Sequence, residues 1–437
     1  MDLRQCLDAA LERNPALKAA FQRWRSAGHV KSAAGSVMRP SLTFKDSYDK
    51  TVRTFGNPLF PIDFPDTNHI ASLELHQSVY SGGKLQAAKE SARHQTARTH
   101  WELVEARHGV VEGVIRAYLD WLQQSEVNEY YRSAIERDQK LVNEITVRVE
   151  AGKALEADRL QARIRLLDDQ RKLLEGGNRA ELARSLVLTQ MDLPKETPIS
   201  PVSDLSMLQS IAEPPADLGD GNAALRASGA GVDAAKAEVD KTRGERRPTV
   251  DVVVRQSHII DGLGFVSEDA DYTDYIAAIE FPIFDSGLRK ERTKAAKANL
   301  QAAREEYRNL RLQKELELTR SKLDLGEATR RLSIAQEKRA AAAENLRVAK
   351  ERHDAGTMRL SETLASQANA ESAATEEIAA RFDVYRAKVT SLPPGACQRG
   401  RSRWQAACGG DGPLPPEPGV GQNPTAPGEC VVRALPG

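Results

Sequence analysis

The sequence predicts an internally duplicated α+β membrane protein, in which short pairs of strands alternate with very long helices. Three observations predict this fold class. Landmark sequences recur once along the chain at a nearly constant spacing. Strand-like stretches of about ten residues carry one apolar face, as the strands of a membrane barrel do. Two stretches of almost seventy residues, 84–150 and 288–355, contain no proline and are rich in alanine, leucine and charged residues.

The duplication has four landmarks. Asn14-Pro15-Ala16-Leu17 recurs as Asn222-Ala223-Ala224-Leu225, and Arg39-Pro40 recurs as Arg247-Pro248, both 208 residues later. Gly82-Gly83 recurs as Ser286-Gly287, and Ala151-Gly152 recurs as Ala355-Gly356, both 204 residues later. Four landmarks in one order predict two copies of one unit. We expect a first repeat at 1–194, a linker at 195–221, a second repeat at 222–392 and an atypical tail at 393–437.

The composition suits long helices better than a thick globular core. Aromatic residues make up 5% of the chain and charged residues 28%, with 62 basic and 62 acidic side chains. The balanced charge, without a basic run that includes aromatic residues, favours no nucleic-acid partner. No window offers the roughly 18 apolar residues that a spanning helix needs. If this protein crosses a membrane, it does so with strands.

The cysteines and the two ends of the chain point to no disulfide, metal site or secretory leader. Cys6 is the only cysteine in the repeated part, so neither a disulfide framework nor a zinc site is expected. The chain opens as an amphipathic helix without a secretory signal, so we expect either a cytosolic protein or one whose leader is absent here. Cys6 is interpreted as a residue on a helix face and not as a lipid acceptor. The tail at 393–437 is expected to be a disordered, proline-rich extension or an out-of-frame end.

Each copy is expected to open with a helix, at 2–38 and 222–246, and to continue with two strands. Apolar and polar residues alternate over 42–48 and 71–79 in the first copy, and over 250–255 and 275–283 in the second. This alternation is typical of a membrane barrel, and equally of a half-buried strand in a soluble sheet. Irregular loops are expected at 50–69 and 258–271. The turns at Gly82, Gly83, Ser286 and Gly287 should redirect the chain into the long helices.

The long helices are expected to be coiled-coil-like. Leucine and alanine fall on two positions of a seven-residue grid, which requires a closely packed partner helix; the positions are Leu318, Leu325, Leu332 and Leu346, with Ala328, Ala335, Ala342 and Ala349. Gly152 and Gly356 can end these helices. Returning helices at 153–191 and 357–391, together with the opening helices, match the long helices in length. Two short helices stacked beside one long helix are therefore expected in each copy.

Four strands cannot close a barrel, because about eight are the fewest that can. An open sheet with an apolar outer face would also leave exposed edges that pair with other chains. Several chains are therefore expected to contribute to one barrel, with their helices forming a second, coaxial barrel. Composition does not give the number of copies.

The chain resembles the TolC-like outer-membrane efflux proteins over roughly residues 2–392. The resemblance rests on the duplicated order of the segments and on their wording, in Leu7-Asp8-Ala9-Ala10-Leu11-Glu12-Arg13-Asn14-Pro15, Gln77-Ser78-Val79-Tyr80-Ser81-Gly82-Gly83, Phe281-Pro282-Ile283-Phe284-Asp285-Ser286-Gly287 and the Ala-Gly turns. It implies a homotrimer with a twelve-stranded barrel in outer-membrane lipid and an α-helical barrel in the periplasm of a Gram-negative bacterium. It also implies two kinds of partner, a periplasmic adaptor and an inner-membrane transporter of the RND, ABC or MFS class.

The resemblance also implies where function lies. The adaptor is expected to dock at Gly152, Lys153, Leu155, Gly356, Thr357 and Leu360. Asp158 matches an acidic residue that holds the periplasmic entrance shut, and Glu362 matches part of an acidic ring; the alternative for each is an ordinary exposed acid on a helix. Two departures are visible, since Ala365 occupies the second ring position and Met358 replaces the arginine expected to pair with Asp158. Arg359 is a candidate substitute for that arginine.

The expected function is that of an exit duct in a tripartite efflux pump. No catalytic constellation, cofactor motif or metal-ligand spacing is found, and His69 and His76 are interpreted as polar strand residues. We therefore expect no enzyme activity and no cofactor. Two alternatives stay open: the outer-membrane component of type I protein secretion, and a soluble coiled-coil scaffold.

Overall fold

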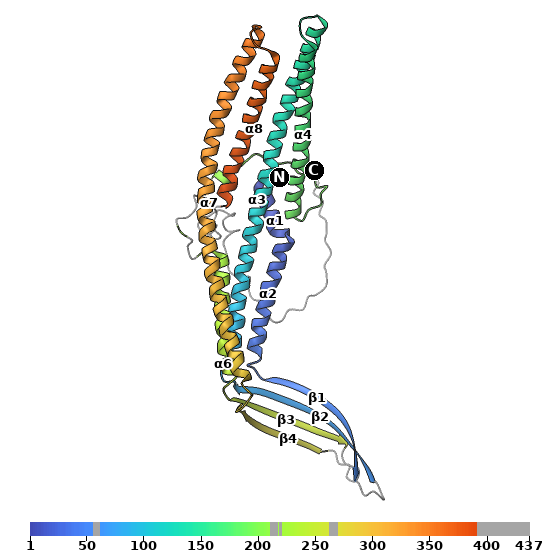
Figure 1. Ribbon diagram of the computed structural model, residues 1–437. Helices are drawn as coiled ribbons and strands as arrows, with labels where there is room; N and C mark the ends of the chain where they lie inside the picture. Colours follow the sequence, from blue (N-terminus) through green and yellow to red (C-terminus); the bar gives the residue numbers. More distant parts are fainter. Residues whose placement is uncertain (56–61, 210–216, 218–220, 262–269, 391–437) are drawn as a thin grey trace, which may run out of the picture. The chain divides into compact units, whose positions relative to one another are not determined.

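The computed structural model describes residues 1–55, 62–209, 217, 221–261 and 270–390 (Figure 1). The first copy contains α1 (Leu3–Arg13), α2 (Pro15–Ser36), β1 (Ser41–Phe55), β2 (Ile62–Tyr80), α3 (Lys84–Glu150) and α4 (Glu156–Gln190). The second copy contains α6 (Ala223–Gly244), β3 (Thr249–Asp261), β4 (Ala270–Glu280), α7 (Leu288–Asp354) and α8 (Leu360–Thr390). A short helix, α5 (Ser206–Gln209), lies in the linker. The expected order of elements is present in both copies, and the tail lies outside the described residues.

The prediction of one opening helix at 2–38 is wrong, because the chain breaks at Asn14. The ψ of Asn14 is 122°, its side-chain oxygen accepts from the backbone N–H of Ala16 and Leu17, and Pro15 begins α2. Proline is favoured at the first position of a helix, where its missing N–H is not needed. The Asn14 amide also donates to the carbonyl of Gln190, 2.9 Å away, which fastens the break to the end of α4. Strand β4 likewise ends at Glu280 and not at 283, just before Pro282, which cannot donate to a ladder.

The helices pack around α3, which contacts helices of both copies. Helix α3 packs against α2 and α4 of its own copy and against α6 and α8 of the other, while α7 packs against α6 and α8. The hydroxyl of the fully buried Tyr118 accepts from the backbone N–H of Val202 at 2.9 Å and lies 3.0 Å from the carbonyl of Met1. Its burial raises the pKa of Tyr118 to about 12. Within the described residues, no helix has the length and apolarity needed to cross a membrane.

The coiled-coil seam predicted for α7 is confirmed where α7 packs against α8. Ala328, Ala335 and Ala349 are buried, at 7%, 1% and 1% exposure. The leucines of the same grid are half-buried. Small side chains on this layer allow two helix backbones to approach closely, which is why a chain with few large apolar residues can still pair its long helices.

The strands form one open antiparallel sheet in the order β1-β2-β3-β4, so β1 and β4 are its edges. One face carries the row Leu42, Leu75, Val254 and Tyr275, in which Leu42 is 64% and Tyr275 81% exposed. The opposite face carries charge: Glu74 lies 2.9 Å from Lys45 on one side and 3.3 Å from Arg255 on the other. The sheet thus has one apolar face and one polar face, and among the described elements no helix packs on the apolar face.

A buried ionic cluster joins the two copies at the level where α3, α4 and α8 meet. The carboxylates of Asp138, Asp169 and Glu371 are at most 3% exposed as residues and lie within 4.8 Å of one another. Arg165 contacts all three carboxylates, and Lys172 donates to Asp169 at 3.0 Å. Three acids and two bases leave one negative charge in excess, so this cluster is costly in its fully ionised form.

We predict that Gly82→Ala destabilises the fold. The φ of Gly82 is +64°, and a Cβ there would lie 2.6 Å from the carbonyl oxygen of Gly244 and 2.7 Å from Cβ of Arg247. Strain and overpacking together should cost about 2–4 kcal/mol, read as a lower midpoint of thermal unfolding by circular dichroism. Gly109→Ala is the control: this helical glycine has nothing within 4 Å, so the change should raise stability by up to about 1 kcal/mol. Equal effects of both changes would contradict this view of the turn.

We predict that Asp138→Asn stabilises the protein more at about pH 7.5 than at about pH 4.5. Burial raises the pKa of Asp138 above its ordinary value, with Asp169 adding to the effect and the bond from Gln367 and the charges of Arg165 and Arg137 opposing it. A raised folded-state pKa means that wild-type stability falls as pH rises through that pKa, whereas the neutral variant escapes this loss. The difference between the two unfolding midpoints, measured across pH, should therefore grow towards neutral pH. A difference independent of pH would contradict the assignment.

Candidate functional site

The two helical hairpins end in turns of the same design (Figure 1). In the first, Gly152 has φ +72° and the N–H of Lys153 donates to the carbonyl of Arg148 at 2.7 Å. In the second, Gly356 has φ +71° and the N–H of Thr357 donates to the carbonyl of Arg352 at 2.8 Å. A residue with left-handed backbone directly after a helix lets N–H groups of the turn bond to the last free carbonyl groups of the helix. Glycine adopts this backbone without strain. The predicted glycine caps of both long helices are confirmed.

The tips present an exposed surface with one exception. Gly152, Lys153, Gly356 and Thr357 are exposed, and Leu155 is exposed at 70%. By contrast, Leu360 is only 6% exposed. It packs with Leu364 of α8 against a buried group from the first hairpin, made of Ile145 and Ala162 and bordered by Leu141, Val142 and Val149. Leu360 therefore helps to hold the two hairpins together and is not accessible to a docking protein while they are in contact.

The four candidate gate residues lie near these turns without pairing with one another. Asp158 accepts from the N–H of Leu155 at 3.3 Å and thereby caps the first turn of α4. Met358 is half-buried, whereas Arg359 and Glu362 are exposed. Among the residues that the structure describes, no ion pair joins Asp158 to Arg359, and the Glu362 carboxylate has no ion-pair partner. A lock formed by Asp158 and Arg359 would thus require them to meet between chains, or after a movement of the tips.

The turns between sheet and helix differ between the copies in one informative way. Gly83 and Gly287 begin the long helices with φ +88° in both. Gly82 is buried, while its equivalent Ser286 keeps a left-handed backbone with φ +53° and is exposed. Asp285 supports the second turn, because its carboxylate accepts from the N–H of Gly287 at 3.0 Å and of Arg289 at 3.1 Å. These bonds lower the pKa of Asp285.

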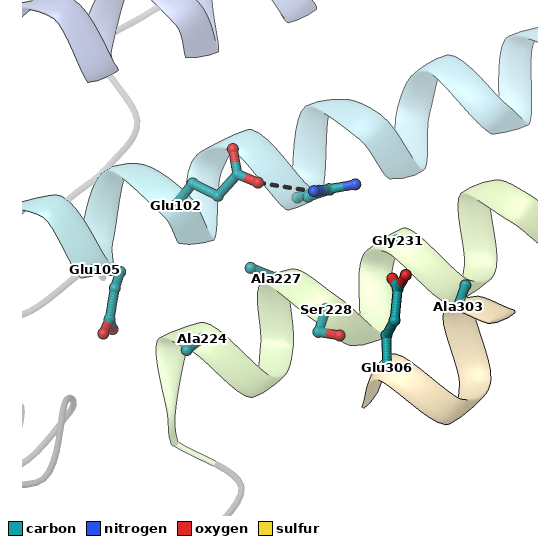
Figure 2. A pocket seen from close by; sticks show the side chains of 9 residues that line it. Glu102, Glu105, Ala224, Ala227, Ser228, Gly231, Ala303 and Glu306 are labelled. Atoms are coloured by element: carbon teal, nitrogen blue, oxygen red, sulfur yellow. Dashed lines mark hydrogen bonds and ion pairs between the residues drawn. The ribbon is translucent and has the colours of Figure 1, made fainter. Parts of the chain in front are cut away.

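A cavity of about 350 Å³ lies where α3, α6 and α7 meet (Figure 2). It is lined by Arg98, Glu102, Glu105 and Glu306, with small residues of α6 between them. Arg98 donates to Glu102 at 2.9 Å, and burial raises the pKa of Glu105. The cavity thus brings three carboxylates and one guanidinium together where the three helices meet.

Sequence reasoning missed the ionic cluster around Arg165 and the apolar contact at Leu360. Both depend on side chains from separate helices, and neither has a motif in the sequence. The cluster is the one group of carboxylates in the described chain with a spacing that could hold a metal ion, yet Arg165 and Lys172 already supply its positive charge.

Comparison with known proteins identifies the family. The model of the outer membrane efflux protein family matches residues 6–186 and 216–390. A search of curated protein sequences finds no significant relative. Among solved structures, the outer-membrane channel OprN is 19% identical with a TM-score of 0.77, over 93% of this chain and 90% of that one.

Two further structures share the fold. The outer membrane protein VceC of Vibrio cholerae is 18% identical with a TM-score of 0.77, over 89% of this chain and 94% of that one. The open state of the MtrE outer membrane channel of Neisseria gonorrhoeae is 16% identical with a TM-score of 0.76, over 93% and 89%. The predicted fold class is confirmed for the protomer, which is internally duplicated, carries four strands and long helices and shares the fold of these outer-membrane channels, and so is the outer-membrane location. This chain belongs to the outer membrane efflux protein family.

Proposed function

We propose that three copies of this chain form the passive exit duct of a tripartite efflux pump. The observation that carries this proposal is the open four-stranded sheet with an apolar outer face and two unpaired edges. Twelve strands from three copies would close a barrel, with the face that bears Lys45, Glu74 and Arg255 towards the lumen. The exposed apolar row would then face lipid.

The helices support the same assembly. Helix α4 carries an exposed apolar stripe at coiled-coil spacing, formed by Leu160, Ile164, Leu167 and Leu174, which are 47–67% exposed. Helix α7 carries a second one, formed by Leu312, Leu316, Leu323 and Ile334, which are 57–69% exposed. Stripes of this kind on monomeric soluble proteins are rare, because they stabilise only when a partner covers them. Neighbouring copies that cover these stripes would close a ring of helices.

We further propose that a periplasmic adaptor docks on the exposed part of the tips, at Gly152, Lys153, Leu155, Gly356 and Thr357. Leu360 contributes from inside, by holding the hairpins in the arrangement that the adaptor meets. Glu362 would supply one acid per copy to a ring at the entrance, and Ala365 leaves this ring with a single layer. Asp158 and Arg359 would form the lock between neighbouring copies.

We propose that the partner at the inner membrane is a transporter of the RND, ABC or MFS class. The same duct geometry serves RND, ABC and MFS pumps and type I protein secretion, so the class of transporter stays a choice among these. A soluble scaffold is disfavoured by the family match and by the apolar face of the sheet. A conduit performs no covalent chemistry, which agrees with a family of channels, and we propose neither an enzyme activity nor a cofactor.

We predict that the combined change Ile164→Glu and Leu167→Glu breaks the assembly. Wild-type protein in mild detergent should have about three times the mass of the 48.0 kDa chain by native mass spectrometry, since a closed barrel needs all three copies. Six charges in the stripes of α4 should shift the mass towards that of one chain. Gln161→Glu with Gln170→Glu adds the same charge beside the stripe and should leave the trimer intact. A monomeric wild-type protein in detergent would refute the proposed duct.

We predict that Glu362→Ala weakens the block of single channels by Mg²⁺. A ring of three carboxylates attracts a divalent ion, and its removal should weaken the block on the order of tenfold, measured as the blocking concentration in planar bilayers. Glu344→Ala is the matched control, because Glu344 is exposed on α7 and already neutralised by Arg347 at 2.7 Å. An unchanged block in Glu362→Ala would exclude the ring while leaving the duct itself untouched.

A further inference from the structure

The chain contains one complete junction between a sheet-to-helix turn and a short helix. The turn at Ser81 and Gly82 is buried against the end of α6, where a Cβ on Gly82 would lie 2.6 Å from the carbonyl oxygen of Gly244. Arg247 closes the junction by donating from its guanidinium to the carbonyl of Gly82 at 3.3 Å. The turn belongs to the first copy and its seat to the second, so this junction joins the halves.

The equivalent junction, between the turn of the second copy and the opening helix of the first, is not formed in the single chain. Its turn, at Ser286, is exposed, and Phe284 beside it is 86% exposed. Its seat would be at Ser36 and Arg39, which occupy the places of Gly244 and Arg247 at the spacing of 208 residues. Both residues are exposed, and the Arg39 side chain has no hydrogen-bond or ion-pair partner among the described residues.

The helices beside the junction repeat the same asymmetry. In the complete junction, α3 lies on α6, and the hydroxyl of Ser91 reaches the carbonyl of Ala234 at 3.4 Å. The equivalent residues are Ala295 on α7 and Ser26 on α2, and both are exposed. Ser26 lies in an open groove of about 510 Å³ on α2, lined by Gln22, Arg25, Ser26, His29, Val30 and Ala33.

The surface on α7 that would face this groove consists mainly of alanines. Leu288, Ala295, Ala298 and Ala302 are exposed and recur at steps of three, four and seven residues, so they form one stripe along α7. Alanines on the stripe allow the two backbones to approach closely, as they do between α7 and α8. The strand order shows the same asymmetry. Strand β2 pairs with β3 beside the complete junction, whereas β4 and β1, beside the junction that is not formed, are the free edges of the sheet.

We propose that the groove on α2 is the seat for α7 of a second copy of this chain, in the register that places Ala295 opposite Ser26. In this register β4 of one copy pairs with β1 of the next, and the Arg39 guanidinium donates to the carbonyl of Ser286 of its neighbour. The proposal rests on the proposed assembly of three copies and adds the surfaces, the register and a positioning residue, Arg39. Because Ser36 and Ser286 replace the two glycines of the complete junction, the backbones stand farther apart here, and the bond from Arg39 has more of the contact to supply.

Paired cysteines test the register. In protein whose tail cysteines are replaced by serine, Ser26→Cys with Ala295→Cys should form covalent dimers and trimers on non-reducing gels after treatment with a short bis-methanethiosulfonate reagent. The buried Cys6, whose burial raises its pKa to about 11, should not react. Ser26→Cys with Lys297→Cys is the control, because residue 297 lies on another face of α7 and should give no such ladder. Ser91→Cys with Ala234→Cys should link within one chain and leave the mass at that of a monomer.

The outcomes separate this proposal from the proposed function. Protein that is trimeric by mass but gives no ladder with Ser26→Cys and Ala295→Cys, or an equal ladder with Lys297→Cys, would overturn the register and leave the duct standing. Protein that is never trimeric would overturn both.

Arg39→Gln tests the role of the arginine. Subunit exchange between differently tagged trimers should become about tenfold faster, while the unfolding midpoint of the dissociated chain should not change. Arg247→Gln should instead lower the unfolding midpoint and leave the rate of subunit exchange unchanged, since the bond of Arg247 lies within one chain. If Arg39→Gln leaves exchange unchanged, Arg39 does not hold the neighbour.

Discussion

A sheet of four strands with one apolar face cannot be satisfied by a single chain, and the rest of the structure depends on that constraint. The edge strands β1 and β4 leave a row of unpaired backbone groups, and inside a bilayer each such group costs several kcal/mol. Side chains such as Tyr275 and Ile279, at 81% and 74% exposure, have no cover from the helices of the same chain. Closure by further copies satisfies the backbone and places the apolar face in lipid. The free stripes of α4 and α7 are the helical counterpart of the same incompleteness.

Within the chain, the two copies are joined by different kinds of contact at different heights. Near the sheet, glycines bring the turn at Gly82 and the end of α6 into backbone contact. Farther along, ion pairs link α8 to α3, with Arg386 2.7 Å from Asp120 and Arg381 bound to Glu126. At the tips the contact is apolar again, at Leu360 and Ile145. Ionic contacts on the surface can exchange one partner for another or for water at small cost, so the middle of α8 is better suited to movement than the junction of α6 with the turn at Gly82.

The sequence predicts those features that depend on neighbouring residues. Periodicity gives the strands, absence of proline gives the two long helices, and glycine at 152 and 356 gives their ends, because each is a local backbone preference. Asn14 shows the limit. Pro15 is a local signal for a helix start, because a proline inside a helix removes a backbone bond, but the bond from Asn14 to Gln190, 176 residues away, that accompanies the break has no signal in the sequence. The burial of Leu360 and the cluster around Arg165 are likewise made by helices that meet only in the folded chain. For the same reason the family resemblance could suggest Asp158 and Arg359 as candidates for a gate but could not tell that they form no ion pair within a single chain.

The divergence of the two copies follows from what each surface has to meet. Gly82 and Gly244 face each other within one chain, where the contact forms during folding at a fixed effective concentration and can be made as close as two backbones allow. Ser286 and Ser36 occupy the same places, but both are exposed in the single chain, and in the proposed assembly they meet only between two chains. A glycine at such an exposed position would add conformational entropy to the unfolded chain without gaining a contact in the free protomer. A serine keeps the turn polar in water, and an arginine such as Arg39 can reach across a wider gap. Glycine at the inner junction and serine with arginine at the outer one is therefore the arrangement expected when the first contact folds the chain and the second assembles it.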